Sequence, residues 1–441
     1  MTKKITCLTL LIFFSIFGLF AQEQPQLLTL SQLLDKALEN NYLLQANAKN
    51  TLIKQAEIEI LKTNYQPRIS TSATFSYWKF LLPNKQKLLG DALTDMYTDV
   101  QFYQTIYDWG ENKIKKSVVD DEILLNSEIR RQIQATIIWG VTDAYFELLK
   151  AKAEVEAHQN ALIQLKSHLQ YTNNLYSIGK VSGVDVLKIN VQISVEEKNY
   201  LKSHTAVLNQ LVKLKRLCFL DDNAAFDVEN IANNLYEQSK NKIIDAANLY
   251  GNALTNHPAI KANTLRVKIE TKQKDILKLQ SRPELFSYGV GSWEHGYIPF
   301  GDNFNYNVGI GLRYTIPYWG GSSFKSRMVQ SQYRIEQLGD EKNQAFMDIK
   351  RDIDLTVNTI NDINAEVFSN EKIIKLAEET LMNATVKYQA GQGAIIDILD
   401  AQAILTEATI AHSKSIVAYL QALARLHYLA GNHSYPFQTG N

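Results

Sequence analysis

The sequence predicts a mainly helical protein that also carries β-strands suited to a membrane and is built from two copies of one unit. Three observations predict this fold class. The chain has 441 residues but only 20 glycines and 8 prolines, about half of average usage, which favours long uninterrupted helices. Groups of residues recur in the same order in both halves. Strict alternation of apolar and polar residues indicates strands between the helices.

Residues 1–21 have the features of a secretory signal peptide. Two lysines near the start precede an apolar run from Leu8 to Phe20, and the small residue Ala21 follows that run. The run is shorter than the roughly 20 residues that a membrane-spanning helix needs. We therefore expect cleavage and export. No later apolar run reaches that length, so we expect any membrane contact of the mature chain to be made by strands.

Residues 22–218 and 241–430 are two copies of one structural unit. The matched groups include Ala37-Leu38-Glu39-Asn40 with Ala253-Leu254-Thr255-Asn256, Ile106–Gly110 with Ile316–Gly320, and Tyr176–Gly179 with Tyr388–Gly391. Each unit has the order helix, strand, loop, strand, very long helix, glycine turn, helix. We expect residues 219–240 to form a less regular equatorial connection and residues 431–441 a C-terminal tail at the same height.

Two helices are predicted to be very long, over 111–178 and 322–390. Each of these segments contains one glycine and no proline, and each would reach ~100 Å at ~1.5 Å per residue. Shorter helices are predicted over about 30–65, 185–218, 241–280 and 395–430, the first opened by a capping box of Thr29 and Gln32. Two short helices match one long helix in length. We therefore expect each long helix to lie beside a stacked, antiparallel pair of short ones.

Each unit is predicted to contain two strands. The clearest is 304–316, where apolar residues occupy the even positions and polar residues or glycine the odd ones. The segments 285–293 and 97–108 alternate in the same way, and 68–80 is assigned mainly by its repeat partner. We interpret the glycines at 289–291 and 309–311 as small residues that ease the curvature of the sheet.

These strands fit either a soluble sheet with one buried face or a membrane barrel. Their length of about 10–13 residues and the export signal favour the barrel. Tryptophans at or beside the strand ends favour it too, and we expect a membrane-interface belt of Trp78, Trp109, Trp293 and Trp319. Since known single-chain barrels begin at about eight strands, protomers would have to share one barrel, as a dimer or a trimer.

Composition excludes several classes of function. The 46 basic and 46 acidic residues balance, and no segment concentrates Lys and Arg among aromatic residues as nucleic-acid binding requires. The eight histidines are dispersed, and no metal-ligand spacing, phosphate-binding loop or nucleophile elbow is present. We therefore expect no enzyme activity, no cofactor, no metal site and no nucleic-acid partner.

An ordered set of short motifs covers nearly all of the mature chain. The motifs are Leu28-Thr-Leu-Ser31 before Ala37-Leu-Glu-Asn-Asn41, the strand-to-helix junctions Tyr107-Asp-Trp-Gly110 and Tyr318-Trp-Gly-Gly321, and Tyr388-x-x-Gly391 before Asp397-Ile-Leu-Asp400. With these motifs and the duplication, the chain resembles the TolC-like outer-membrane channel proteins of Gram-negative bacteria.

The resemblance implies a homotrimer with a twelve-stranded barrel in outer-membrane lipid and an α-helical barrel that forms a tunnel through the periplasm. It implies a passive exit duct of a tripartite efflux pump or of a type I secretion system. Its partners would be a periplasmic adaptor and an inner-membrane transporter. The alternative from a different class is a periplasmic coiled-coil scaffold or adaptor without a membrane barrel.

The two glycine turns at the far ends of the long helices are the expected periplasmic tip. They consist of Ile178, Gly179 and Lys180 in the first unit and Ala390, Gly391 and Gln392 in the second. Glycine in a left-handed conformation closes a helix, which by itself explains both glycines. The resemblance adds that this tip is met by the adaptor or the transporter.

Acidic residues follow these turns. Asp397 and Asp400 share a helix face, and Asp185 is the repeat counterpart of Asp397. Carboxylates in the first turns of a helix also stabilise it through the helix dipole. The resemblance implies that Asp397 and Asp400 narrow the periplasmic entrance, while Tyr388 holds it shut. In a trimer their six carboxylates would attract cations.

The latch of this entrance departs from the family pattern. A well-known member has an arginine where this chain has Gly393, and Lys188 stands where the first copy could have had a second acid. We therefore expect a different pair to latch the entrance, such as Lys188 with an acid of the other repeat.

Overall fold

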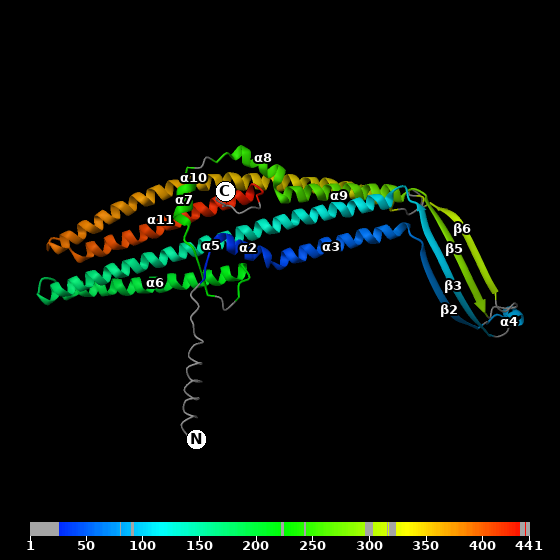
Figure 1. Cartoon of the computed structure of the whole chain (residues 1–441), viewed down its shortest axis with the longest axis horizontal. Helices are drawn as coiled ribbons and strands as arrows, with labels where there is room; N and C mark the ends of the chain where they lie inside the picture. The colour runs from blue at the N-terminus through cyan, green and yellow to red at the C-terminus, as the bar shows by residue number, and fades with distance from the viewer. Residues whose placement is uncertain are drawn as a thin grey trace, which may run out of the picture. The chain divides into compact units, whose positions relative to one another are not determined.

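The computed structural model confirms a mainly helical fold, with 74% of the residues that it describes in helices. It describes residues 26–79, 81–89, 92–221, 225–241, 244–295, 303–314, 316, 323–432 and 437. The expected signal peptide and Trp319 lie outside these residues. Figure 1 shows the elements in chain order. Among the described helices, none is both long and apolar enough to cross a membrane.

The chain forms two compact units. The first combines Met1–Leu44, Gln132–His257 and Ile349–Asn441, and the second combines Gln45–Arg131 and Pro258–Asp348. Each sequence repeat contributes to both units, so the compact units do not coincide with the repeated ones. Each compact unit therefore contains segments from both sequence repeats.

The longest helices are α5 (Glu111–Ser177) and α10 (Phe324–Gln389). Each is followed, after a short turn, by a helix of 35 residues, α6 (Gly183–Leu217) and α11 (Ile395–Leu429). These ends lie within two residues of the expected ones. Helical periodicity and glycine turns are local signals, which is why they can be read from the sequence so closely.

The other two short helices are each broken in two, which the sequence reasoning missed. The expected helix over 30–65 is divided into α2 (Leu30–Glu39) and α3 (Tyr42–Lys62), and α3 continues directly into the 3-10 turn η1 (Thr63–Tyr65). The expected helix over 241–280 is divided into α8 (Ala246–Asn256) and α9 (Pro258–Gln280). Asn41 Oδ1 accepts a hydrogen bond from the N–H of Leu43 at 2.9 Å and so begins α3. Pro258 begins α9, because proline fits the first turn of a helix but not its interior.

The expected connection between the repeats contains regular structure. Strand β1 (Gln26–Leu28) pairs in parallel with β4 (Phe226–Val228), and α7 (Ala232–Ser239) follows. The buried Tyr145 of α5 donates its hydroxyl to the carbonyl of Glu229 at 2.5 Å. The connection is therefore packed against the long helix and is not a loose linker.

The second compact unit carries a four-stranded antiparallel sheet in the order β2-β3-β5-β6 (Figure 1). Its strands are β2 (Arg68–Lys79), β3 (Ala92–Tyr107), β5 (Glu284–His295) and β6 (Asn303–Arg313), with the short helix α4 (Pro83–Leu89) between β2 and β3. β3 begins five residues before the expected start at 97, so β2 and β3 form a longer hairpin than their alternation indicates.

The pairing register gives the sheet two different faces. The apolar face carries exposed side chains of β6, namely Phe304, Tyr306, Val308, Ile310 and Leu312. The polar face carries Ser70, Ser72, Asp99, Gln101 and Tyr103. Because successive side chains alternate between faces, the register also places Phe286 and Tyr288 of β5 on the polar face.

These two rings explain the glycines of β6. Phe286 pairs with Gly311, and Tyr288 pairs with Gly309. A Cβ atom at Gly311 would lie 2.5 Å from the Phe286 ring, and one at Gly309 would lie 3.0 Å from the Tyr288 ring. The glycines make room for the rings of the neighbouring strand, which is a more specific role than the expected easing of curvature.

Candidate functional site

The helical hairpins α5–α6 and α10–α11 end in the same type of turn. Gly179 and Gly391 have φ angles of 72° and 75°. In the first turn the N–H of Lys180 donates to the carbonyl of Leu175 at 2.9 Å, and the second turn contains the equivalent bond. No atom lies within 4 Å of a Cβ built at either glycine. The positive φ, and not a lack of space, therefore requires glycine in these Schellman turns.

The acidic residues after the turns cap the helices that follow. Asp185 Oδ2 accepts a hydrogen bond from the N–H of Ser182 at 3.4 Å. Asp397 Oδ2 accepts one from the N–H of Ala394 at 3.2 Å. The stabilising role expected of first-turn carboxylates is therefore present at both repeats.

The expected latch is not formed within this chain. Lys188 and Asp400 are both exposed. In the part of the chain that the structure describes, neither residue forms an ion pair.

Tyr388 joins the two hairpins. It is 6% exposed, and its hydroxyl lies 3.2 Å from Oγ1 of the fully buried Thr172 in α5. Burial raises the pKa of the Tyr388 hydroxyl, which is therefore neutral at physiological pH. Its ring packs in a cluster of buried side chains from both hairpins, formed with Leu162, Leu165, Ile189, Ile193, Ile395, Ile398 and Leu399.

Sequence reasoning missed Thr172. In the second repeat the corresponding position is Ala384, which packs against the same cluster. The detectable signal is this difference between the repeats, a polar residue in one copy where the other has an apolar one. Its meaning depends on the contact with Tyr388, which lies 216 residues away.

The expected docking residues surround the turns and are open to solvent. Ile178, Lys180, Ala390 and Gln392 are all exposed, and Ile178 exposes 64% of its surface. Further exposed apolar side chains lie beside them at Tyr176, Val184 and Leu187. The tip thus combines hydrogen-bonded glycine turns with exposed apolar side chains.

The expected tryptophan belt is only partly brought together. Trp293 pairs with Phe304 and lies on the apolar face, whereas the register places Trp78 on the polar face. Trp109 follows β3 with a φ of 61°, and its indole N–H donates to the carbonyl of Pro283 at 2.6 Å. All three expose 40% or more of their surface.

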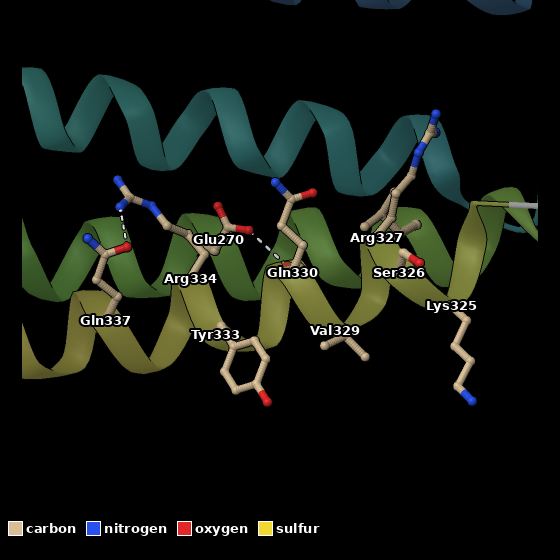
Figure 2. A pocket seen from close by; sticks show the side chains of 11 residues that line it. Glu270, Lys325, Ser326, Arg327, Val329, Gln330, Tyr333, Arg334 and Gln337 are labelled. Atoms are coloured by element: carbon tan, nitrogen blue, oxygen red, sulfur yellow. Dashed lines mark hydrogen bonds between the residues drawn. The ribbon is translucent and has the colours of Figure 1, made fainter.

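A groove of about 1080 Å³ runs along the start of α10 (Figure 2). In Figure 2, Lys325, Val329 and Tyr333 project to one side of α10 and Arg327 and Arg334 to the other. Val329 and Tyr333 expose 46% and 67% of their surface. The groove is lined by a mixture of charged, polar and apolar side chains, and these lining residues form no converging set of catalytic groups.

Together, the duplicated helical hairpins, the glycine turns and the two-faced sheet define a transport protein of the helical channel class. The chain belongs to the outer membrane efflux protein family, whose model matches residues 33–218 and 249–432. It is 20% identical to the outer membrane protein TolC of Salmonella enteritidis over 96% of this chain and 86% of that protein.

Two further comparisons agree with this assignment. The chain is 20% identical to the alkaline protease secretion protein AprF of Pseudomonas aeruginosa, over 74% of this chain and 68% of that one. The crystal structure of CusC matches with a TM-score of 0.77 at 14% identity and covers 91% of this chain and 92% of that one. Membership of the family confirms the expected outer-membrane location, the large periplasmic portion and a passive, non-enzymatic role.

Proposed function

We propose that this chain is a passive exit duct that spans the outer membrane and the periplasm and serves a tripartite efflux pump. The observation that carries this proposal is the sheet of the second unit. Its outer strands β2 and β6 have no further strand beside them within the described residues, and its apolar face is exposed. In lipid, unpaired strand edges require partner strands, whereas an exposed apolar face is suited to contact with the lipid itself.

Completion by further copies of the same chain gives the proposed architecture. Three protomers with four strands each would close a shared barrel of about twelve strands, within the range of known outer-membrane barrels. The apolar face would then contact outer-membrane lipid and the polar face would line the duct. The exposed apolar residues along the groove of α10 provide a surface against which a neighbouring protomer would pack.

The periplasmic end is proposed to be the gate. Asp397, Asp400 and Asp185 would line the entrance, and the contact of Tyr388 with Thr172 would hold the two hairpins of each protomer together. Lys188 would pair across protomers. The exposed turns would dock the periplasmic adaptor, which connects the duct to the inner-membrane transporter.

Type I protein secretion is the second candidate. It is favoured by the similarity to a protease secretion protein over 74% of this chain. Both candidate functions use the same duct, and they differ in the substrate that the inner-membrane transporter delivers to it. Co-purification of a drug transporter or of a secretion transporter with the tagged chain distinguishes them.

Cysteine crosslinking between strand edges tests the shared barrel. Thr71→Cys on β2 combined with Tyr306→Cys or Val308→Cys on β6 should give disulfide-linked oligomers in outer-membrane fractions, and the single-cysteine variants should not. Absence of crosslinks together with recovery of the chain from the soluble periplasm would support the alternative of a scaffold without a barrel.

A further inference from the structure

A second cavity lies where the polar face of the sheet meets helices α5 and α9. It has a volume of about 600 Å³ and is lined by charged and aromatic side chains. Its lining includes Arg68, Arg282 and Arg313 and the rings of Tyr65, Tyr103 and Trp109. It shares no lining residue with the groove of α10.

The carboxylates of this cavity already have partners. Asp108 accepts hydrogen bonds from the hydroxyl of Tyr65 at 2.7 Å and from the N–H of Asn112 at 2.8 Å. It thereby caps the start of α5.

The other two acids are occupied in the same way. Glu111 pairs with Lys115 at 2.7 Å. Glu284 accepts hydrogen bonds from the hydroxyls of Tyr103 and Thr105 at 3.1 and 2.9 Å. None of the three carboxylates therefore needs a ligand.

Two of the three guanidinium groups of this cavity lie over aromatic rings. Arg282 lies over the Trp109 ring at 5.3 Å, and Arg313 lies over Tyr103 and Phe286 at 5.5 and 4.9 Å. Arg68 is the cross-strand neighbour of Tyr103. Among the described residues, the guanidinium groups of Arg68 and Arg282 have no hydrogen-bond acceptor. The cavity therefore offers unused planar N–H donors beside flat rings.

We propose that this cavity binds an anionic group carried on a flat ring. Arginine donates paired hydrogen bonds to carboxylate, sulfonate or phosphate oxygens, and an aromatic ring of the ligand would stack on the tyrosine and tryptophan rings. The inference rests on the proposed function, because the polar face meets passing solutes only if it lines the duct. The ligand would be an anionic aromatic solute in transit; a lipid headgroup shares the anionic phosphate but lacks the ring.

Binding of 1-naphthalenesulfonate to the full mature chain in phosphatidylcholine nanodiscs, measured by calorimetry, tests this site. Arg68→Gln with Arg282→Gln should weaken binding roughly tenfold, as expected for the loss of charge-assisted hydrogen bonds. Arg266→Gln, which removes an exposed charge from α9 outside the cavity, should leave binding unchanged. The cation 1-naphthylmethylammonium should bind at least roughly tenfold more weakly than the sulfonate.

Wild-type binding by the double variant, or equal binding of the cation, would overturn the proposal. If the double variant does not assemble, Arg282→Lys keeps the charge but loses the planar fork, and it should still weaken binding. Phosphatidylglycerol added to the nanodiscs tests the need for the ring. Unchanged binding of the sulfonate supports a site for aromatic anions, whereas competition by this lipid would show that an anion without a ring is sufficient and would overturn that part of the proposal. If the protein conducts ions in planar bilayers but does not bind the sulfonate, only the proposed binding site is disproved. If it binds the sulfonate but does not conduct ions, the proposed duct is disproved.

Discussion

The hydroxyl of Tyr388 lies 3.2 Å from Oγ1 of Thr172 and connects the end of one long helix to the other. Both residues are buried, so neither hydroxyl can exchange its partner for water without opening the cluster around it. The contact links the two repeats at the end of the protein where the entrance is proposed. A single substitution that removes this contact therefore tests whether it holds the proposed entrance closed.

Thr172→Val should weaken the closed arrangement. It keeps the shape of the side chain but leaves the buried Tyr388 hydroxyl without its partner, at a cost of about 1–3 kcal/mol. We expect higher single-channel conductance in planar bilayers. The matched control is Thr205→Val, because the Thr205 hydroxyl bonds only within its own helix. Equal conductance of both variants would contradict the latch.

Asp397→Asn with Asp400→Asn should weaken block of the channel by multivalent cations. The Asp397→Asn side chain keeps an amide oxygen that can still accept the N–H of Ala394, so the helix cap is retained while the charge is lost. We expect hexamminecobalt block to weaken by at least roughly tenfold and conductance to rise. Asp362→Asn, at an exposed position of α10, is the control. Unchanged block would exclude these carboxylates from the entrance.

Gly391→Ala should destabilise the oligomer, because a non-glycine residue at positive φ costs about 1–2 kcal/mol. Gly140→Ala is the matched comparison, since Gly140 lies inside α5 with no atom within 4 Å of a Cβ. There alanine should stabilise the helix by about 0.5–1 kcal/mol. The temperature of oligomer dissociation on semi-native gels should therefore shift in opposite directions, and parallel shifts would contradict the turn geometry.

Gly311→Ala should destabilise the sheet by about 1–3 kcal/mol through overpacking against Phe286. Gly291→Ala should be nearly neutral, because its Cβ would meet Phe304 at an ordinary distance of 3.7 Å. The readout is the yield of heat-modifiable oligomer in outer membranes. Restoration of that yield by Phe286→Ala in the Gly311→Ala background identifies the ring as the cause. A normal yield for Gly311→Ala alone would disprove the close contact.

The folded protein should lose stability as the pH falls from about 6.5 to 4. Burial lowers the pKa of His257 to about 4, whereas the unfolded chain binds this proton near pH 6.5. Protonation below pH 6.5 therefore favours the unfolded state, by roughly 3 kcal/mol at most for this residue. Burial lowers the pKa of His168 and His412 too, with the same sign. His257→Asn should flatten the dependence measured by urea unfolding between pH 7 and 4, and an unchanged slope would exclude His257.

Much of the fold could be predicted because its signals are local. The ends of the long helices follow from residues beside them, such as Gly179 and Gly391, whose conformation depends on the chain alone. The breaks at Asn41 and Pro258 were equally local and were missed, since a continuous apolar pattern on both sides outweighed the two stop signals. The membership of the family was likewise readable, because the motifs are contiguous and recur in order.

The sequence by itself determined the duplicated order of elements, the glycine turns and the acids placed after them. The tertiary structure decided which residues these elements bring together. The strand register turned Phe286 and Tyr288 toward the polar face and over Gly311 and Gly309, although alternation alone left the face of β5 open. Packing of the hairpins made Thr172 the partner of Tyr388. Such pairs depend on register and packing between distant segments, which no short stretch of sequence specifies.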